Sequence, residues 1–471
     1  MSLEEQFDVL IIGCGMSGIA AGIRLSMYQK RVLIVDSHNA PGGLNGFYFK
    51  DGRKFDVGLH AVTNYVEPGI KGTPLQKLLR QLRINRDELD LCPQWGSRIA
   101  FPEVSLRFTN DFTVLEQEIA EAFPAQIDRF RRFVQHMDAF DALAYEGPVL
   151  SARSELGAYI SDPLLVDMLM CPLCYYGSAR NDNDMDFDQF IVMFRSVFRE
   201  GFCRPFEGVR KIIKVLLDRY RSLGGKRKMG CGVARLLKDG QRIAGAVLED
   251  GSQVYADLVL SSAGLGETLK LVDAALVPTH NIGTMSFVES IQVISNQPES
   301  LGMDDTIVFF SRSDKFRYET PAEPLDLGSG VICVPNNYAF GSDRALPEGM
   351  IRITAQADYN YWSRLNDADY LRSKEEWFMR LQQVLTFAYP KLDLAALNRQ
   401  ELARDVFTPK TVERFTRHFN GAVYGAPQKK KSGQTDYENL ILIGTDQGFL
   451  GIIGSLLSGI SMANRYGLTG I

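Results

Sequence analysis

A glycine-rich turn between a strand and a helix near the start of the chain constrains the fold most strongly. Residues 9–12 form a continuous apolar run, as expected for a parallel strand that is buried on both faces. The turn Gly13-x-Gly15-x-x-Gly18 follows directly. In this pattern the first glycine permits a tight turn, the second lets the backbone approach a pyrophosphate, and the third lets the helix pack closely on the strand.

The next segment supports a dinucleotide site at this turn. The predicted helix would offer its free N–H groups and the positive end of its dipole to an anion. A second apolar strand, residues 32–35, ends in Asp36, which is placed to bond a ribose hydroxyl. An acid at this position disfavours a 2′-phosphate, so we expect FAD or NAD rather than NADP. The alternative is a glycine-rich turn with a purely structural role.

The stretch after Asp36 favours FAD. It reads SHNAPGGLNGFYFKDGRKFDVGLHAVTNY and holds a double-glycine turn, a short hairpin and the sequence DVGLH. This pattern resembles the flavoprotein superfamily that includes phytoene desaturases, carotenoid isomerases, retinol saturases and amine oxidases. The resemblance implies that the double-glycine turn lies along FAD and that the segment after D-x-G approaches the isoalloxazine. The arginine usual after the paired glycines is replaced here by Leu44-Asn45.

The middle of the chain returns to the same fold. Between residues 205 and 264 we expect a helix, two hairpin turns at Asp239-Gly240 and Asp250-Gly251, and an apolar strand at residues 258–260. The superfamily has the same helix, hairpin and strand. The resemblance implies that the Val233 backbone meets the adenine and that Ala263 and Gly264 pass the cofactor.

The end of the chain, LILIGTDQGFLGIIGSLLSGI, predicts a buried strand, a turn and a helix. The strand would deliver Gly444 and Asp446 to the cofactor edge of the sheet, and Gly451–Gly454 would let backbone approach a flat ring. By resemblance, the acid bonds a ribityl hydroxyl, and the helix N-terminus stabilises negative charge at the edge of the flavin. The alternative is an apolar core helix after a strand.

Two motifs favour one branch of the superfamily. Gly421-x-x-Tyr424-Gly425 before the last strand, and DVGLH, resemble the retinol saturase and carotenoid isomerase branch. No cysteine follows Cys333, so a cysteinyl flavin at the terminal helix is not expected and FAD would be bound non-covalently. We expect cofactor contacts from Gly13, Gly15, Met16, Ser17, Gly18, Asp36, Ser37, Gly43, Leu44, Gly58, Leu59, His60, Val233, Ala263, Gly264, Gly444, Asp446, Gly451, Ile453 and Gly454.

These elements predict an α/β protein, in which a Rossmann-like FAD-binding domain is interleaved with a helical and mixed-sheet substrate region. FAD-binding parts are expected at residues 1–68, 205–276 and 416–471. Residues 69–204 read mostly helical, and residues 277–415 read as sheet plus helix. A sheet with helices across the flavin face would form a tunnel for an elongated apolar ligand.

Three side chains are candidates for chemistry at that tunnel. His60 follows the strand that should reach the flavin, and it could orient substrate or move a proton. Tyr424 and Tyr65 could wall the ring or donate a proton. Each has a plain alternative, because a satisfied core histidine and packed aromatic rings give the same pattern.

Two other motifs suggest metal or redox chemistry only weakly. Cys171-x-x-Cys174 lies in an apolar helical stretch and has no second CxxC or histidine pair to complete a zinc site. The acidic run NDNDMDFD, residues 181–188, lacks the glycine and the terminal glutamate of an EF-hand loop. We therefore expect a core helix and a solvated loop.

Composition restricts the partners and the compartment. A formal net charge of -5 gives no reason to expect nucleic acid. Seven scattered cysteines fit a reducing compartment, and the acidic start MSLEEQ does not resemble a signal peptide, so we expect a cytoplasmic protein. The stretch TPLQKLLRQLRI, with basic Lys77 and Arg80, is either a surface helix that draws lipid substrate from a membrane or a helix packed on its own core. The oligomeric state stays open.

Three functions are open at this point. The first is an FAD oxidoreductase that desaturates, saturates or isomerises carbon–carbon double bonds of an extended apolar polyene or isoprenoid. The second is an amine-oxidase-like enzyme on a smaller polar substrate, which would need an aromatic cage. The third is a flavin-binding protein without turnover.

Overall fold

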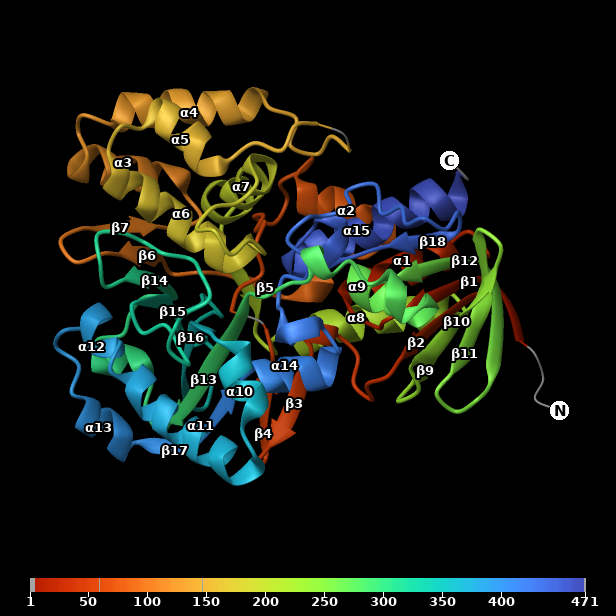
Figure 1. Ribbon diagram of the computed structural model, residues 1–471. Helices are drawn as coiled ribbons and strands as arrows, with labels where there is room; N and C mark the ends of the chain where they lie inside the picture. Colours follow the sequence, from red (N-terminus) through yellow and green to blue (C-terminus); the bar gives the residue numbers. More distant parts are fainter. Residues whose placement is uncertain (1–4, 59, 146, 470–471) are drawn as a thin grey trace.

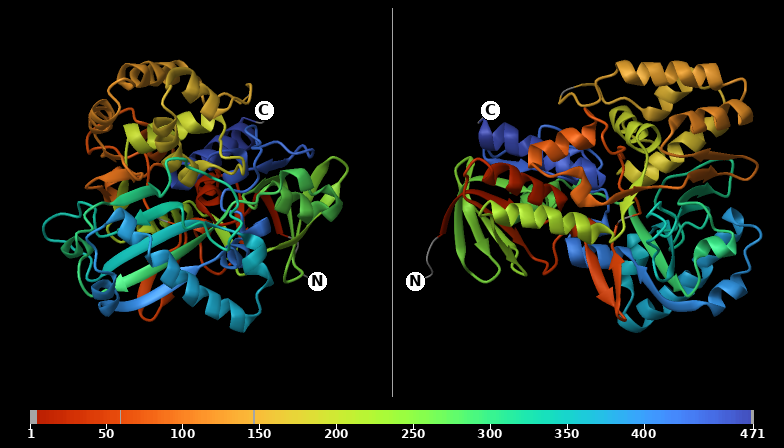
Figure 2. Two further views of the ribbon diagram at one scale, coloured as in Figure 1. Left: turned by 60° about the vertical axis from the view of Figure 1, so that its left-hand side comes forward. Right: turned by 180° about the vertical axis from the view of Figure 1, so that it is seen from behind.

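The computed structural model describes residues 5–58, 60–145 and 147–469 and has two large sheets, each covered by helices (Figures 1 and 2). The predicted α/β class is confirmed. The first sheet lies beside both chain termini, and the second lies at the other end of the molecule (Figure 1). Within the described residues, no helix combines the length and the apolar character needed to cross a bilayer.

The first sheet has the order β10-β11-β12-β1-β2-β9, with β18 paired to the end of β12. The pairs of β1 with β2 and β12, of β2 with β9, and of β12 with β18 are parallel. Its strands are β1 (Glu5–Ile12), β2 (Val32–Asp36), β9 (Lys226–Met229), β10 (Val233–Asp239), β11 (Arg242–Leu248), β12 (Gln253–Ser261) and β18 (Leu440–Leu442).

Alternation along β1 shows why this strand reads as one apolar run. Val9 and Ile11 face a core shared with helices on one side of the sheet, whereas Leu10 and Ile12 face a second core on the other side. The helices of the first core are α1 (Met16–Ser26), α2 (Pro74–Leu82), α8 (Val209–Ser222) and α15 (Gly451–Met462). Leu271 and Val272 of α9 (Leu265–Val272) pack against the second core.

The second sheet has the order β17-β13-β16-β15-β14-β6-β7. All its pairs are antiparallel except β14 with β6. Its strands are β6 (Ser97–Ala100), β7 (Ser105–Phe108), β13 (Ser286–Ile294), β14 (Ile307–Ser311), β15 (Ser329–Cys333), β16 (Gly349–Ala357) and β17 (Glu401–Phe407). Two short ribbons complete the sheets: β3 (Phe47–Lys50) with β4 (Arg53–Asp56), and β5 (Leu91–Pro93) with β8 (Cys203–Pro205).

Helices cover both faces of the second sheet. One face packs on a core that includes side chains of α3 (Phe112–Ala122), α4 (Ile127–Ala139), α5 (Ala152–Tyr159), α6 (Pro163–Gly177) and α7 (Phe187–Phe194). The other face packs on side chains of α11 (Asp367–Gln382), α12 (Leu385–Ala388) and α13 (Leu394–Arg399). The short helices α10 (Tyr359–Arg364) and α14 (Pro409–Thr416) follow β16 and β17, respectively.

The fold decides between the two interpretations of the basic helix α2. Its apolar side chains Leu75, Leu78, Leu79 and Leu82 are at most 3% exposed, because they pack on α1, α8 and α15. A helix that lies on a membrane would turn its apolar face toward lipid. The four leucines of α2 instead pack inside the protein, as expected for a helix packed on its own core.

Candidate functional site

A cavity of about 680 Å³ lies at the carboxyl ends of the parallel strands of the first sheet. Loops that follow β1, β2, β12 and β18 line it, which is where open α/β sheets bind ligands. The predicted cofactor residues that line this first cavity are Gly13, Gly15, Met16, Ser17, Asp36, Ser37, Gly43, Leu44, Val233, Ala263 and Gly444. Segments far apart in the sequence therefore meet at one site.

The glycine turn has the geometry that the sequence predicts. Gly13 has φ of 100°, and α1 begins at Met16 with Gly15 as its N-cap and without a side-chain cap. Gly15 lines the cavity, and a Cβ atom on it would have no neighbour within 4 Å, whereas one on Gly18 would lie 2.0 Å from the carbonyl oxygen of Gly13. The turn thus leaves room, and uncapped N–H groups, for a pyrophosphate.

The double-glycine turn lies against the first one. The N–H of Gly42 donates to the carbonyl oxygen of Cys14 at 2.8 Å. The carboxylate of Asp36 accepts from the N–H of Cys14 at 2.7 Å and from the N–H of His38 at 2.8 Å. Asp36 therefore fixes the glycine turn against the end of β2 while it lines the cavity, and its bond to a ribose hydroxyl stays a prediction.

Asp446 does not line the cavity, although the sequence analysis expects it to contact the cofactor. Its carboxylate is 3% exposed and accepts from the N–H of Leu265 at 2.7 Å and from the N–H of Ala426 at 2.8 Å. The Nζ atom of the buried Lys429 lies 3.6 Å from the same carboxylate. Asp446 thus ties two loops to the end of β18, and this geometry does not support a direct bond to a ribityl hydroxyl. Gly18 and Gly264 line neither this cavity nor the one that adjoins it, and Leu59 lies outside the described residues.

A second cavity, of about 570 Å³, adjoins the first. Predicted site residues along it are Leu44, Gly58, His60, Tyr424, Gly451, Ile453 and Gly454. The second cavity extends between α6 and α7, the second sheet and the start of α15. Both cavities are lined by Leu44, Asn45, Val57, Phe407, Val412, Thr445 and Ser455, so they share part of their walls.

His60 lies at the wall of the second cavity, where the buried ion pair of Glu289 and Arg352 holds it. Its Nε2 atom lies 3.1 Å from Oε1 of Glu289 and 3.1 Å from Oγ1 of Thr354. Arg352 donates from Nε to the same carboxylate and from Nη2 to the carbonyl oxygen of Val57 at 2.6 Å. Burial alone would raise the pKa of Glu289, but Arg352 and His60 lower it below its ordinary value. The glutamate is therefore a carboxylate that fixes the ring of His60.

The two tyrosine candidates have different positions. Tyr424 lines the second cavity and donates its hydroxyl to the carbonyl oxygen of Tyr175, so it forms part of the wall. Tyr65 packs in the core below α2 and lines neither cavity, and burial raises its pKa to about 12. The guanidinium of Arg86 lies 5.5 Å from its ring centre. The prediction that Tyr65 acts on substrate is therefore wrong, because its ring is part of the core.

Several lining residues escaped the sequence analysis. The first cavity is also lined by Ser262, Glu267, Lys270, His418 and Ser455, and the second by Tyr175, Tyr176, Glu200 and Glu289. A sequence feature could have identified Glu289, since it is the one acid in the strand-like run SFVESIQVI. No sequence feature distinguishes Tyr175 and Tyr176, because they lie in an apolar helix whose pattern also fits a helix buried in the core.

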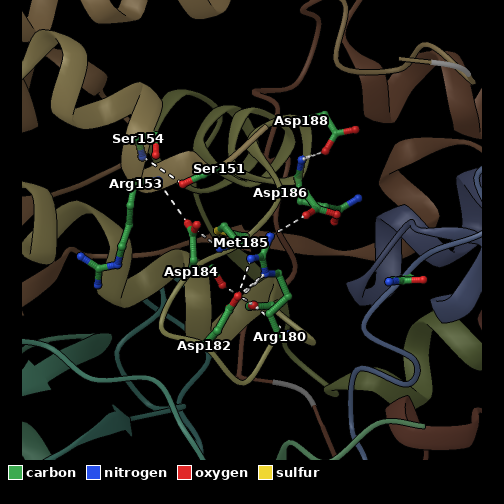
Figure 3. Close-up of polar contacts among 12 residues, drawn as sticks. Ser151, Arg153, Ser154, Arg180, Asp182, Asp184, Met185, Asp186 and Asp188 are labelled. Atoms are coloured by element: carbon green, nitrogen blue, oxygen red, sulfur yellow. Dashed lines mark hydrogen bonds and ion pairs between the residues drawn. The ribbon is translucent and has the colours of Figure 1, made fainter. Parts of the chain in front are cut away.

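The two weak motifs have structural roles. Cys171 and Cys174 are buried in α6, and burial raises the pKa of both thiols. The acidic segment is not only solvated: Arg180 donates to Asp182 and, at 3.0 Å, to Asp186 (Figure 3). Across residues 5–58, 60–145 and 147–469, no group of three or more His, Cys, Asp or Glu side chains could hold a metal ion.

Comparisons with known proteins agree with this geometry. Residues 16–465 match the sequence model of the family described as flavin containing amine oxidoreductase. Prolycopene isomerase 2 of an Oncidium hybrid cultivar is 23% identical over 98% of this chain and 84% of its own. The neurosporene-forming phytoene desaturase of Rhodobacter capsulatus is 26% identical over 57% of this chain and 54% of its own.

The fold has a solved counterpart. An oxidoreductase from Methanosarcina mazei, at 16% identity, superposes with a TM-score of 0.65 over 97% of this chain and 100% of its own. The family match begins at Met16, directly after Gly15, and includes the double-glycine turn and the terminal helix, which both contribute residues to the wall of the first cavity. The chain therefore belongs to the flavin-containing amine oxidoreductase family and is an FAD-dependent oxidoreductase.

Proposed function

We propose that the protein acts on carbon–carbon double bonds of an extended apolar polyene or isoprenoid, such as a carotenoid or a retinoid. The observation that carries this proposal is the second cavity, which adjoins the FAD cavity and has a largely apolar wall that includes Val192, Met193, Phe287, Val331 and Leu457. Relatives named prolycopene isomerase and phytoene desaturase support the same substrate class.

Bound FAD supplies uptake or release of a hydride equivalent, and the protein binds and orients the substrate. In this scheme Gly58 and the start of α15 border the place where the two cavities meet. The fixed ring of His60 lines the second cavity and can hold or move a proton at its wall. Desaturation, saturation and cis–trans isomerisation all use this arrangement, and they remain alternatives within the proposal.

The test is incubation of the pure holoenzyme with cis and trans carotenoid precursors and retinoids, once with oxidised and once with reduced flavin. A product that differs by two hydrogens would identify a desaturase or a saturase. A new product of unchanged mass, formed only with reduced flavin, would identify an isomerase. Failure of every polyene, together with hydrogen peroxide release on adding amines, would favour the amine-oxidase alternative.

We further propose that the opening of the second cavity contacts a membrane surface, from which an apolar substrate could enter. Support comes from the side chains around it. Lys77 of α2 and Leu143 both line the cavity, Leu143 is 54% exposed, and Ile70 just before α2 is 52% exposed. Basic and apolar side chains in one exposed region suit an anionic bilayer.

A further inference from the structure

A group of polar side chains interrupts the apolar wall of the second cavity. This group, the polar patch, consists of Thr63, Asn64, Arg195, Ser196 and Glu200. All five residues line the second cavity, and none of them lines the first. A purely apolar ligand at the polar patch would displace water without replacing its hydrogen bonds.

Two unusual backbone conformations build the polar patch. Asn64 has φ of 60°, in the left-handed region that a residue other than glycine rarely adopts. Arg195–Arg199 form a π-helical turn after α7, and such turns are rare and frequent at functional sites. The N–H of Asn64 donates to the carbonyl oxygen of Ser196 at 3.2 Å, so the two irregular segments hold each other. Backbone of this kind persists where the surrounding structure fixes it, and it clusters at ligand sites.

Asn64 fixes the carboxyl group of Glu200. Its Nδ2 atom donates to Oε2 of Glu200 at 2.8 Å, and its Oδ1 atom accepts from the hydroxyl of Thr63 at 2.8 Å. The N–H of Glu200 donates to the carbonyl oxygen of Arg195 at 2.9 Å, within the π-helical turn. The backbone and one carboxyl oxygen of Glu200 are therefore held in place.

The other oxygen of this carboxyl group is free. Oε1 of Glu200 makes no hydrogen bond to any described residue, and it is not among the inaccessible polar atoms that lack a partner. Because Glu200 lines the second cavity, a ligand in that cavity can reach this oxygen. An oriented carboxyl group with one open oxygen is a ready partner for a polar group of a ligand.

The surroundings of Glu200 favour a neutral ligand group. Burial raises the pKa of Glu200 above its ordinary value, although Asn64 and Arg195 oppose this shift. A hydroxyl group suits either form, since it can donate to a carboxylate or accept from a carboxylic acid. Lys77 and Arg195 already place two positive charges on the wall of this cavity, which disfavours an ammonium group.

Resting on the proposed function, we propose that the substrate carries a hydroxyl group and that Oε1 of Glu200 binds it. The polyene chain then continues along the apolar wall to the residues that the two cavities share. The polar patch lies outside that shared wall, so the reacting double bonds are separate from the hydroxyl group. A site built to bond a hydroxyl group discriminates against the analogue that lacks it.

The experiment measures binding, not turnover. Axerophthene, retinol and retinylamine share one polyene chain and differ in the terminal group, and each is titrated into the FAD-loaded protein by equilibrium dialysis. We expect retinol to bind about tenfold more tightly than either analogue, the effect of one buried hydrogen bond. Glu200→Leu should reduce the preference for retinol over axerophthene to about one while the affinity for axerophthene stays unchanged. Glu200→Gln keeps an acceptor oxygen and should retain most of the preference.

Ser196→Ala is the matched control. It removes a hydroxyl group of the same polar patch, but one that already donates to the carbonyl oxygen of Met193 at 3.1 Å, so the preference should remain. Bound FAD per chain shows that each variant is folded.

The outcomes separate this inference from the proposed function. Equal binding of retinol and axerophthene to the unmodified protein, or a preference that survives Glu200→Leu, would overturn the inference and leave the proposed function intact. Binding of lycopene, which has no oxygen, without binding of retinol would do the same. Tighter binding of retinylamine than of retinol would overturn the inference and favour the amine-oxidase alternative. Failure of lycopene and of all three ligands to bind would overturn both.

Discussion

The Nε2 atom of His60 lies 3.1 Å from Oε1 of Glu289, although 229 positions separate the two residues along the chain. His60 belongs to the segment that follows β4, and Glu289 lies in the middle of β13. The contact therefore joins the segment after β4 to the second sheet at the wall of the second cavity. Arg352 of β16, opposite Ile291 of β13, completes the network from the same sheet.

The first prediction concerns the stability of this network. Glu289→Gln should lower the free energy of unfolding at pH 7 by about 3 kcal/mol or more, because it removes one charge of a buried ion pair. The effect should depend on pH, since the pKa of Glu289 in the folded protein is below the ordinary 4.5. A lowered pKa stabilises the fold fully above about pH 4.5, and this stabilisation disappears as the pH falls through the folded value.

Urea unfolding of both proteins at pH 7 and below pH 4 measures the difference. Glu348→Gln is the control, because it breaks a partly exposed pair with Arg53. Such pairs contribute about 0–1 kcal/mol, so this variant should remain close to the unmodified protein. A Glu289→Gln effect no larger than the control, or one that persists unchanged in acid, would contradict the buried-pair account.

The second prediction distinguishes the roles of Gly15 and Gly18 in the first glycine turn. Gly15→Ala should leave the stability of the FAD-free protein nearly unchanged, since the added methyl group meets no protein atom within 4 Å. Its affinity for FAD should fall by about tenfold or more, because the methyl group enters the pyrophosphate space. Gly18→Ala should instead destabilise the fold by about 1–3 kcal/mol, because its Cβ would lie 2.0 Å from the carbonyl oxygen of Gly13.

Flavin absorbance per protein chain after dialysis, and urea midpoints of the FAD-free proteins, check both glycine variants. The two variants are controls for each other, since they carry the same added methyl group three positions apart. Full retention of FAD by Gly15→Ala would show that the cofactor does not depend on this turn.

Local patterns explain how much of the site could be predicted. The residues that line the first cavity follow strands whose apolar runs and glycine turns are visible over a few positions, so Gly15 and Asp36 were found. His60 was found from the resemblance, but its partner Glu289 depends on the register of β13 with β16, which no local pattern encodes. Tyr65 was misjudged because an aromatic residue after a strand fits a core and a cavity wall equally well.

Asp446 shows a different limit of the sequence. A buried acid next to a glycine turn indicates that something must compensate its charge, but not what does. In the fold, two backbone N–H groups and Lys429 supply that compensation, and all three come from segments outside the turn itself.

The third prediction follows from this contact. Asp446→Ala should destabilise the protein by about 3 kcal/mol, because the buried Lys429 loses its counter-charge. Burial lowers the pKa of Lys429, which is the expected response of an amine in that environment. Adding Lys429→Met should recover part of the loss, since removing both charges of a buried pair is often neutral. A double-mutant cycle of urea unfolding measures the coupling energy between Asp446 and Lys429. Purely additive losses of stability would show that the two side chains do not interact.

The fourth prediction tests the proposed membrane contact. Co-sedimentation with anionic vesicles should fall in the double variant Lys77→Glu and Arg80→Glu, because both side chains are exposed on α2 beside the second cavity. The binding should also weaken at high salt, which screens exposed charges. Arg235→Glu with Lys238→Glu is the matched control: it makes the same change in charge at exposed positions of β10, the edge strand of the first sheet (Figure 1). Equal loss in both double variants would mean that net charge, not this surface, governs sedimentation, and no loss in either would refute contact through α2.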